Sequence, residues 1–173
     1  MGDLKIKRVC GFNISSIHFS MMILPYINKE LEKEKNIVTI LEGNLEKNIK
    51  EILSKITLNN EAKEKILNIN WKATDIEKMN IEKYLKQRLT EEKNLSIIVY
   101  GKEKYINEAN KIINKCIIKN EKNIKNKRIK IIDCYTVNDF NDNIREILEQ
   151  HDAIFNTSGE KKIEEVFEDY HSA

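Results

Sequence analysis

The stretch Val9–Met22, VCGFNISSIHFSMM, has the position of a phosphate-binding loop: an apolar run, a glycine, a polar turn and a helix start. A catalytic loop of the G-x-x-x-x-G-K-[ST] type needs a second glycine, and a lysine that binds the transferred phosphate. Ser16 and Ile17 occupy those two positions. The stretch therefore lacks the cation that phosphoryl transfer needs. Ser15 and Ser16, at the predicted helix start, could still bind an anion weakly.

Other residues with catalytic potential form no complete set. His18 falls in an apolar helix, which favours a packed or surface role, and His151 falls at a helix end, where an imidazolium suits the dipole. Cys134 and His151 could be read as nucleophile and base. A whole predicted helix separates them, however, and Cys134 lies in an apolar strand, which favours a structural cysteine. The cysteines have no metal-ligand spacing, so we predict no metal site and no cofactor.

The elements that must position these residues alternate between strand and helix. Amphipathic helices separate short apolar runs, a pattern typical of a mostly parallel sheet covered on both faces. We therefore predict an α/β fold, a three-layer sandwich with about six strands, as a single domain over residues 1–173. A helix is expected from Ser15 or Ser16 to about Lys35, with a kink or a late start at Pro25. The expected strands are Leu4–Phe12, Asn36–Leu41, Ile66–Trp71, Leu95–Tyr100, Arg128–Tyr135 and a last one within residues 152–159.

Ligands of open parallel sheets bind beyond the carboxyl ends of the strands. Four of the five glycines are expected at that edge, which indicates either close approach of a ligand or simply strand-to-helix turns. Trp71, Tyr100 and Tyr135 could line an apolar pocket there, or close the core with their polar tips in water. The predicted ligand-binding residues are Gly11, Asn13, Ser15, Ser16, Glu42, Tyr100, Tyr135 and Thr157.

The composition and net charge restrict the classes of partner that the chain is expected to bind. The net charge is +2, and the most basic run, Lys119–Lys130, has no aromatic residues for base stacking, so nucleic acid is not expected as a partner. No apolar run is long enough to span a membrane and no signal peptide is recognisable, which predicts a cytoplasmic protein.

The closing segment, IIDCYTVNDFNDNIREILEQHDAIFN, resembles the end of the MEDS domain, the DcmR-type sensory domain of methanogens and methylotrophs. The similarity extends over roughly residues 7–155. The family opens with a His-Ile-Cys-type strand, whereas here Cys10 is present without the preceding histidine. The residues that carry the closing pattern are Cys134, Tyr135, Phe140, Ile147, Leu148 and His151.

The resemblance implies a RecA/KaiC-like domain without a working phosphate loop, serving a sensory role. We therefore expect a non-catalytic cytoplasmic regulatory domain that binds a small ligand or a partner protein at the strand-end edge. The implied partners are a kinase or a transcription regulator, or a second copy in a homodimer. The alternative expectation is a nucleotide-binding or transferase enzyme with a non-standard phosphate site.

Overall fold

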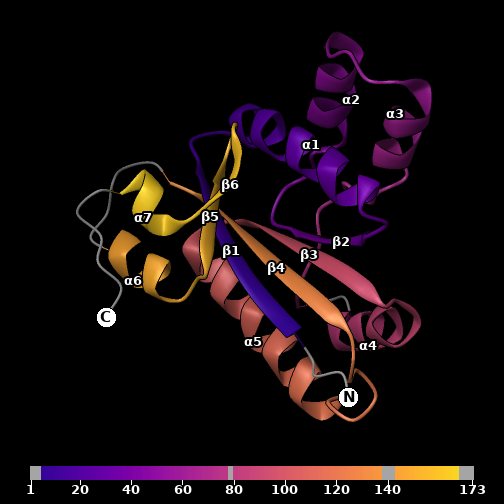
Figure 1. Ribbon diagram of the computed structural model, residues 1–173, viewed down its shortest axis with the longest axis vertical. Helices are drawn as coiled ribbons and strands as arrows, with labels where there is room; N and C mark the ends of the chain where they lie inside the picture. The colour runs from indigo at the N-terminus through magenta and orange to yellow at the C-terminus, as the bar shows by residue number, and fades with distance from the viewer. Residues whose placement is uncertain (1–4, 78–79, 138–142, 168–173) are drawn as a thin grey trace.

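The computed structural model describes residues 5–77, 80–137 and 143–167. The predicted fold class is confirmed: a six-stranded, mostly parallel sheet lies between two layers of helices (Figure 1). The strand order is β2-β3-β4-β1-β5-β6, and only the last pair is antiparallel. The strands are β1 (Lys5–Asn13), β2 (Asn36–Leu41), β3 (Asn94–Gly101), β4 (Arg128–Thr136), β5 (Ala153–Asn156) and β6 (Gly159–Lys161).

Helices α1, α2 and α3 cover one face of the sheet, and α4 to α7 cover the other. Strand side chains alternate between the two faces, so Ile97 packs on the α4–α7 side and its neighbour Ile98 on the α1–α3 side. The helices are α1 (Ser16–Glu32), α2 (Glu46–Lys55), α3 (Asn60–Leu67), α4 (Ile81–Glu91), α5 (Glu103–Lys119), α6 (Ile144–Glu149) and α7 (Ile163–Val166).

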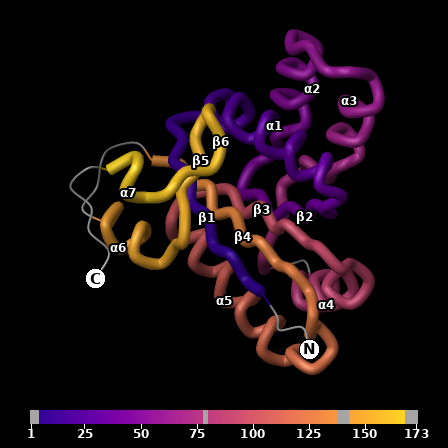
Figure 2. Tube along the Cα trace, in the orientation of Figure 1, coloured from indigo at the N-terminus to yellow at the C-terminus, as the bar shows by residue number. Residues whose placement is uncertain are grey.

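Strand β1 lies near the centre of the sheet although it comes first in the chain. It pairs with β4 on one side and with β5 on the other, so an early strand lies beside a late one (Figure 2). Cys10 lies opposite Asp133, and Asn13 lies opposite Thr136. Because α1 leaves β1 on one face while α6 follows β4 on the other, the connections reverse direction between these two strands.

Two predicted elements are wrong. Residues 66–71 do not form a strand: Ile66 and Leu67 end α3, and the Trp71 indole donates to the carbonyl of Ile66 over 2.9 Å. The amphipathic pattern near the C-terminus also predicts a helix from about Glu160 to Tyr170. Its start is wrong, because Gly159–Lys161 is strand β6 and, within the described residues, the helix is confined to Ile163–Val166. The sequence also predicts that Asn138 caps the helix after the fifth expected strand, but this residue lies outside the described ones.

Helix α1 is continuous from Ser16 to Glu32 and contains Pro25, so it neither ends nor starts late at the proline. Pro25 is solvent-exposed, so its ring does not enter the core. In the described part of the chain, no helix is both long and apolar enough to cross a membrane.

Candidate functional site

The carboxyl ends of β1 and β4 form the position where an open α/β sheet is expected to bind a ligand, because the chain connections diverge there. Asn13 ends β1 and is almost completely buried. Its amide donates to the carbonyl of Tyr135 over 3.2 Å, and its side-chain oxygen accepts from the hydroxyl of Thr136 over 3.2 Å. Asn13 therefore joins the two strand ends, and both of its polar groups have partners within the chain.

Gly11 lies inside β1 rather than in the turn after it. A Cβ built at this position would lie 2.2 Å from Cε1 of Phe155. The glycine therefore makes room for an aromatic ring of the core, and that ring fills the space that a ligand bound at Gly11 would need.

The two serines begin α1, as the sequence predicts. Ser15 is the N-cap residue: its hydroxyl accepts from the backbone N–H of His18 over 3.1 Å. The ring Nδ1 of His18 in turn accepts from the N–H of Ile14 over 3.1 Å, which gives this histidine a capping role. Ser16 accepts from the side-chain amide of Asn48 over 2.8 Å, so it links α1 to α2.

Glu42 follows β2 and is exposed, but its carboxylate is not free for a ligand. Its Oε1 accepts from the backbone N–H of Lys102 over 2.8 Å. A Cβ on Gly101, whose φ is +153°, would lie 2.7 Å from the same oxygen. Glu42 thus closes the ends of β2 and β3, and Gly101 allows that close approach.

The remaining predicted residues lie apart from one another. Tyr100 packs on the α1–α3 face, with its ring centroid 4.4 Å from that of Phe19. Tyr135 packs on the opposite face, 5.8 Å from the ring of Phe12. Thr157 lies in the turn between β5 and β6. The structure gathers Asn13, Ser15 and Ser16 near the end of β1, but it does not bring all eight predicted residues into one pocket.

Sequence reasoning missed an uncharged surface at this same edge. Between Arg8 and Lys29 the sequence has no Asp, Glu, Lys or Arg, although charged residues make up 34% of the chain. Four exposed apolar residues lie in this segment: Ile14, which lies just before α1, and Ile17, Met21 and Pro25, which follow helical spacing along it. The first three are 72%, 55% and 56% exposed. We call these four residues the uncharged strip; the absence of charge was the signal in the sequence.

Sequence reasoning also missed Asp133, a carboxylate that is only 2% exposed on the α4–α7 side of β4. Its Oδ2 lies 2.7 Å from Nε2 of His151, and its Oδ1 accepts from the amide of Asn110 over 2.9 Å. The signal was a single acidic residue inside the otherwise apolar run IKIIDCY. Its full set of partners accounts for its burial.

The structure does not form the nucleophile and base that Cys134 and His151 could have made. Cys134 points into the α1–α3 core, whereas both ring nitrogens of His151 are engaged on the other face, with Asp133 and the carbonyl of Ile147. Burial, and secondarily the charge of Asp133, raise the pKa of Cys134 well above its usual value and that of Cys10 to about 12. Both thiols are therefore protonated and unreactive near neutral pH.

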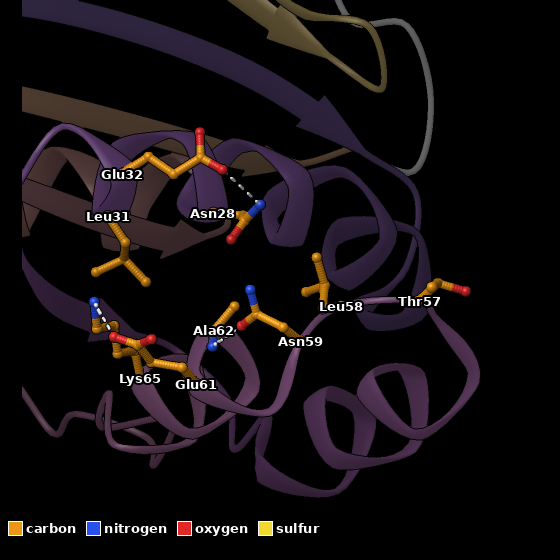
Figure 3. Close-up of a pocket in the computed structure, with 9 residues that line it drawn as sticks. All are labelled: Asn28, Leu31, Glu32, Thr57, Leu58, Asn59, Glu61, Ala62 and Lys65. Atoms are coloured by element: carbon orange, nitrogen blue, oxygen red, sulfur yellow. Dashed lines mark hydrogen bonds and ion pairs between the residues drawn. The ribbon is translucent and has the colours of Figure 1, made fainter.

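The polar side chains that line a groove between α1 and α3 do not point to a common centre where a ligand could bind (Figure 3). Its polar side chains pair with their own helical neighbours: Asn28 with Glu32, and Lys65 with Glu61. Asn59 caps α3 by accepting from a backbone N–H over 2.7 Å. Because each of these groups points to a local partner, the groove looks like ordinary solvated surface.

Residues 5–77, 80–137 and 143–167 contain no group of three or more His, Cys, Asp or Glu placed to hold a metal ion. No protein-family model matches the chain, and no curated protein matches it either. Function must therefore be argued from the site itself.

Proposed function

We propose that this protein is a non-catalytic, cytoplasmic sensory or regulatory domain that acts through a partner protein docked at the carboxyl edge of the sheet. The observation that carries the proposal is the uncharged strip of Ile14, Ile17, Met21 and Pro25. Large apolar side chains that line one exposed helix face mark interaction surfaces, whereas scattered ones do not.

Of the two occupants expected for this edge, a partner protein has better support than a small ligand. Asn13, Ser15 and Ser16 already hold partners within the chain, so a ligand would have to displace those bonds. The apolar side chains of the uncharged strip beside them are exposed to solvent, so a partner protein could pack on them directly. The same bonds, and the absent lysine, leave the nucleotide-binding or transferase alternative without a supporting contact.

A second copy of the chain is the partner that we propose to test first. The strip carries no charge, so two copies can place the same face together without like-charge repulsion, as a two-fold dimer requires. The kinase or transcription regulator implied by the MEDS resemblance would dock on the same strip in a hetero-complex. The family assignment is likewise part of the proposal.

Sedimentation of the full chain over a wide concentration range tests this proposal. We expect a concentration-dependent dimer, and loss of that dimer when Ile17→Glu and Met21→Glu are combined. Glu at position 17 falls in the first turn of α1, where a negative charge is favourable, so the variant should stay folded. The control is Ile118→Glu, which changes an even more exposed apolar residue on α5 and should leave the dimer intact. A wild-type monomer at every concentration, or a strip variant that still dimerises, would refute self-association through the strip.

A further inference from the structure

A polar pocket of about 530 Å³ opens on the α4–α7 side of the sheet, away from the uncharged strip. Its volume lies in the range of small-ligand sites, roughly 300–1,000 Å³. The floor comes from β1 and β4, one wall from α5 and the other from the end of α6. The residues that matter are Arg8, Asn110, Lys111, Asn114, Asp133 and His151.

The buried acid and imidazole in this pocket bond to each other and to the main chain. Nδ1 of His151 lies 2.5 Å from the carbonyl oxygen of Ile147, and Nε2 lies 2.7 Å from Oδ2 of Asp133. Oδ1 of Asp133 accepts from the amide of Asn110, so both carboxylate oxygens have partners other than Arg8.

The guanidinium of Arg8 forms no ion pair with any described residue. Its Nη1 donates to the side-chain oxygen of Asn110 over 3.3 Å, and its Nη2 donates to that of Asn114. Among the described residues, these neutral amide oxygens are the partners of its guanidinium. Asp152 also contacts Arg8, but it accepts from the main-chain N–H over 2.9 Å.

The hydrogen bonds fix the direction of the guanidinium. The amide of Asn110 donates to Asp133, which turns the oxygen of Asn110 toward Arg8. A half-buried arginine held by two amides is ready to form a paired, charge-assisted bond with a planar or tetrahedral anion. Lys111, exposed on α5 beside the pocket, adds a second positive charge at its rim.

We propose that this pocket binds a small oxyanion, a carboxylate or a phosphate group, through the guanidinium of Arg8. His151 and Asn110 occupy the two carboxylate oxygens of Asp133, so the guanidinium of Arg8 is left without an ion pair. Asn107 and Asn114 of α5 line the same pocket and can supply further hydrogen bonds to a polar ligand. The inference does not rest on the proposed function, because none of these residues belongs to the uncharged strip.

Nuclear magnetic resonance titration of the full chain tests the proposal, with sodium succinate and sodium phosphate as separate probes at constant ionic strength. We expect saturable shifts of the Arg8 guanidinium and of the Asn110 and Asn114 side-chain amides. Arg8→Gln should weaken the binding of the probe by about tenfold or more, because it removes a charge-assisted pair. Lys5→Gln removes an exposed charge from the same strand and should change the affinity little. Saturation by succinate alone identifies a carboxylate site, and saturation by phosphate alone identifies a phosphate site.

If Arg8→Gln does not fold, Arg8→Lys keeps the charge but removes the paired donors, and we expect severalfold weaker binding in that variant. Shifts that stay linear well into the millimolar range with both probes would overturn the proposal. So would equal affinity in the wild type and in the folded Arg8 variant.

Discussion

Gly11 has no side chain because the ring of Phe155 occupies the space where a Cβ would lie. We expect Gly11→Ala to destabilise the protein by about 1–3 kcal/mol, the usual cost of overpacking a core. Replacing glycine in a strand otherwise stabilises by only about 0.5–1 kcal/mol, so the clash should win. Urea unfolding measures the difference.

Gly43 provides the matched control for this substitution, because nothing lies within 4 Å of a Cβ built there. We expect Gly43→Ala to change the free energy of unfolding by no more than about 0.5 kcal/mol. Adding Phe155→Leu to Gly11→Ala should cost less than the two single changes together, since the smaller side chain relieves the clash. Equal effects of Gly11→Ala and Gly43→Ala would show that the ring moves aside at no cost.

Residue patterns predicted contacts between neighbours in the sequence better than contacts between distant parts of the chain. The cap at Ser15 followed from its type and place before an apolar helix. The burial of Asp133 did not, because it depends on His151 and Asn110, which only the folded chain brings to β4. Gly11 was assigned to a ligand turn for the same reason: its neighbour Phe155 is distant in sequence.

At the scale of elements, the prediction failed where local pattern and tertiary pairing disagree. The apolar alternation over residues 66–71 imitates a strand, yet Ile66 belongs to α3 and Trp71 packs back onto it. Strand β6 was missed because Gly-Glu-Lys carries no apolar pattern; its strand form comes from the pairing with β5. The apolar runs of β1 to β4, buried by two layers of helices, were recognisable for that reason.

Strand β6 is fixed to the rest of the sheet by Glu160, which accepts from the hydroxyl of Tyr26 over 2.8 Å and pairs with Lys130 and Lys7. Burial alone would raise the pKa of Glu160, but hydrogen bonds from Lys7 and Tyr26 and the charge of Lys130 outweigh it and lower the pKa to about 2. A carboxyl whose pKa is lower in the folded state stabilises the protein above its unfolded value of 4.5, and this contribution is lost as the pH falls toward 2.

We therefore expect Glu160→Gln to destabilise the protein by roughly 1–3 kcal/mol at neutral pH, the range for hydrogen bonds to a charged group. The difference from wild type should shrink as the pH falls from about 5 toward 2. Thermal unfolding at several pH values checks this expectation. Glu164→Gln changes an exposed neighbour and should follow the wild-type curve. If Glu160→Gln lowers the stability by the same amount at every pH, the ionised Glu160 carboxylate is not the source of the stabilisation.

The whole molecule consists of two helical layers that share one sheet, so we expect loss of packing in one core to weaken the sheet that supports the other. The single Trp, Trp71, is buried in the α1–α3 core and reports on that side. Ile97 is fully buried in the opposite core. Ile98, the next residue of β3, is fully buried in the same core as Trp71. The pair allows the cooperativity of the sheet to be measured.

We expect Ile97→Ala to destabilise the protein by about 2–5 kcal/mol, through lost burial and the cavity that remains. If residues 1–173 form one cooperative unit, the Trp71 fluorescence transition in urea should shift with the circular dichroism transition, although Trp71 lies across the sheet. Ile98→Ala serves as the control, because it perturbs the tryptophan's own core and should move both signals whether or not the faces are coupled. If Ile97→Ala leaves the fluorescence midpoint unchanged and the circular dichroism signal changes in two steps, the two faces unfold independently. If both midpoints shift together, the central strands β1, β3 and β4 transmit the loss of one core to the other.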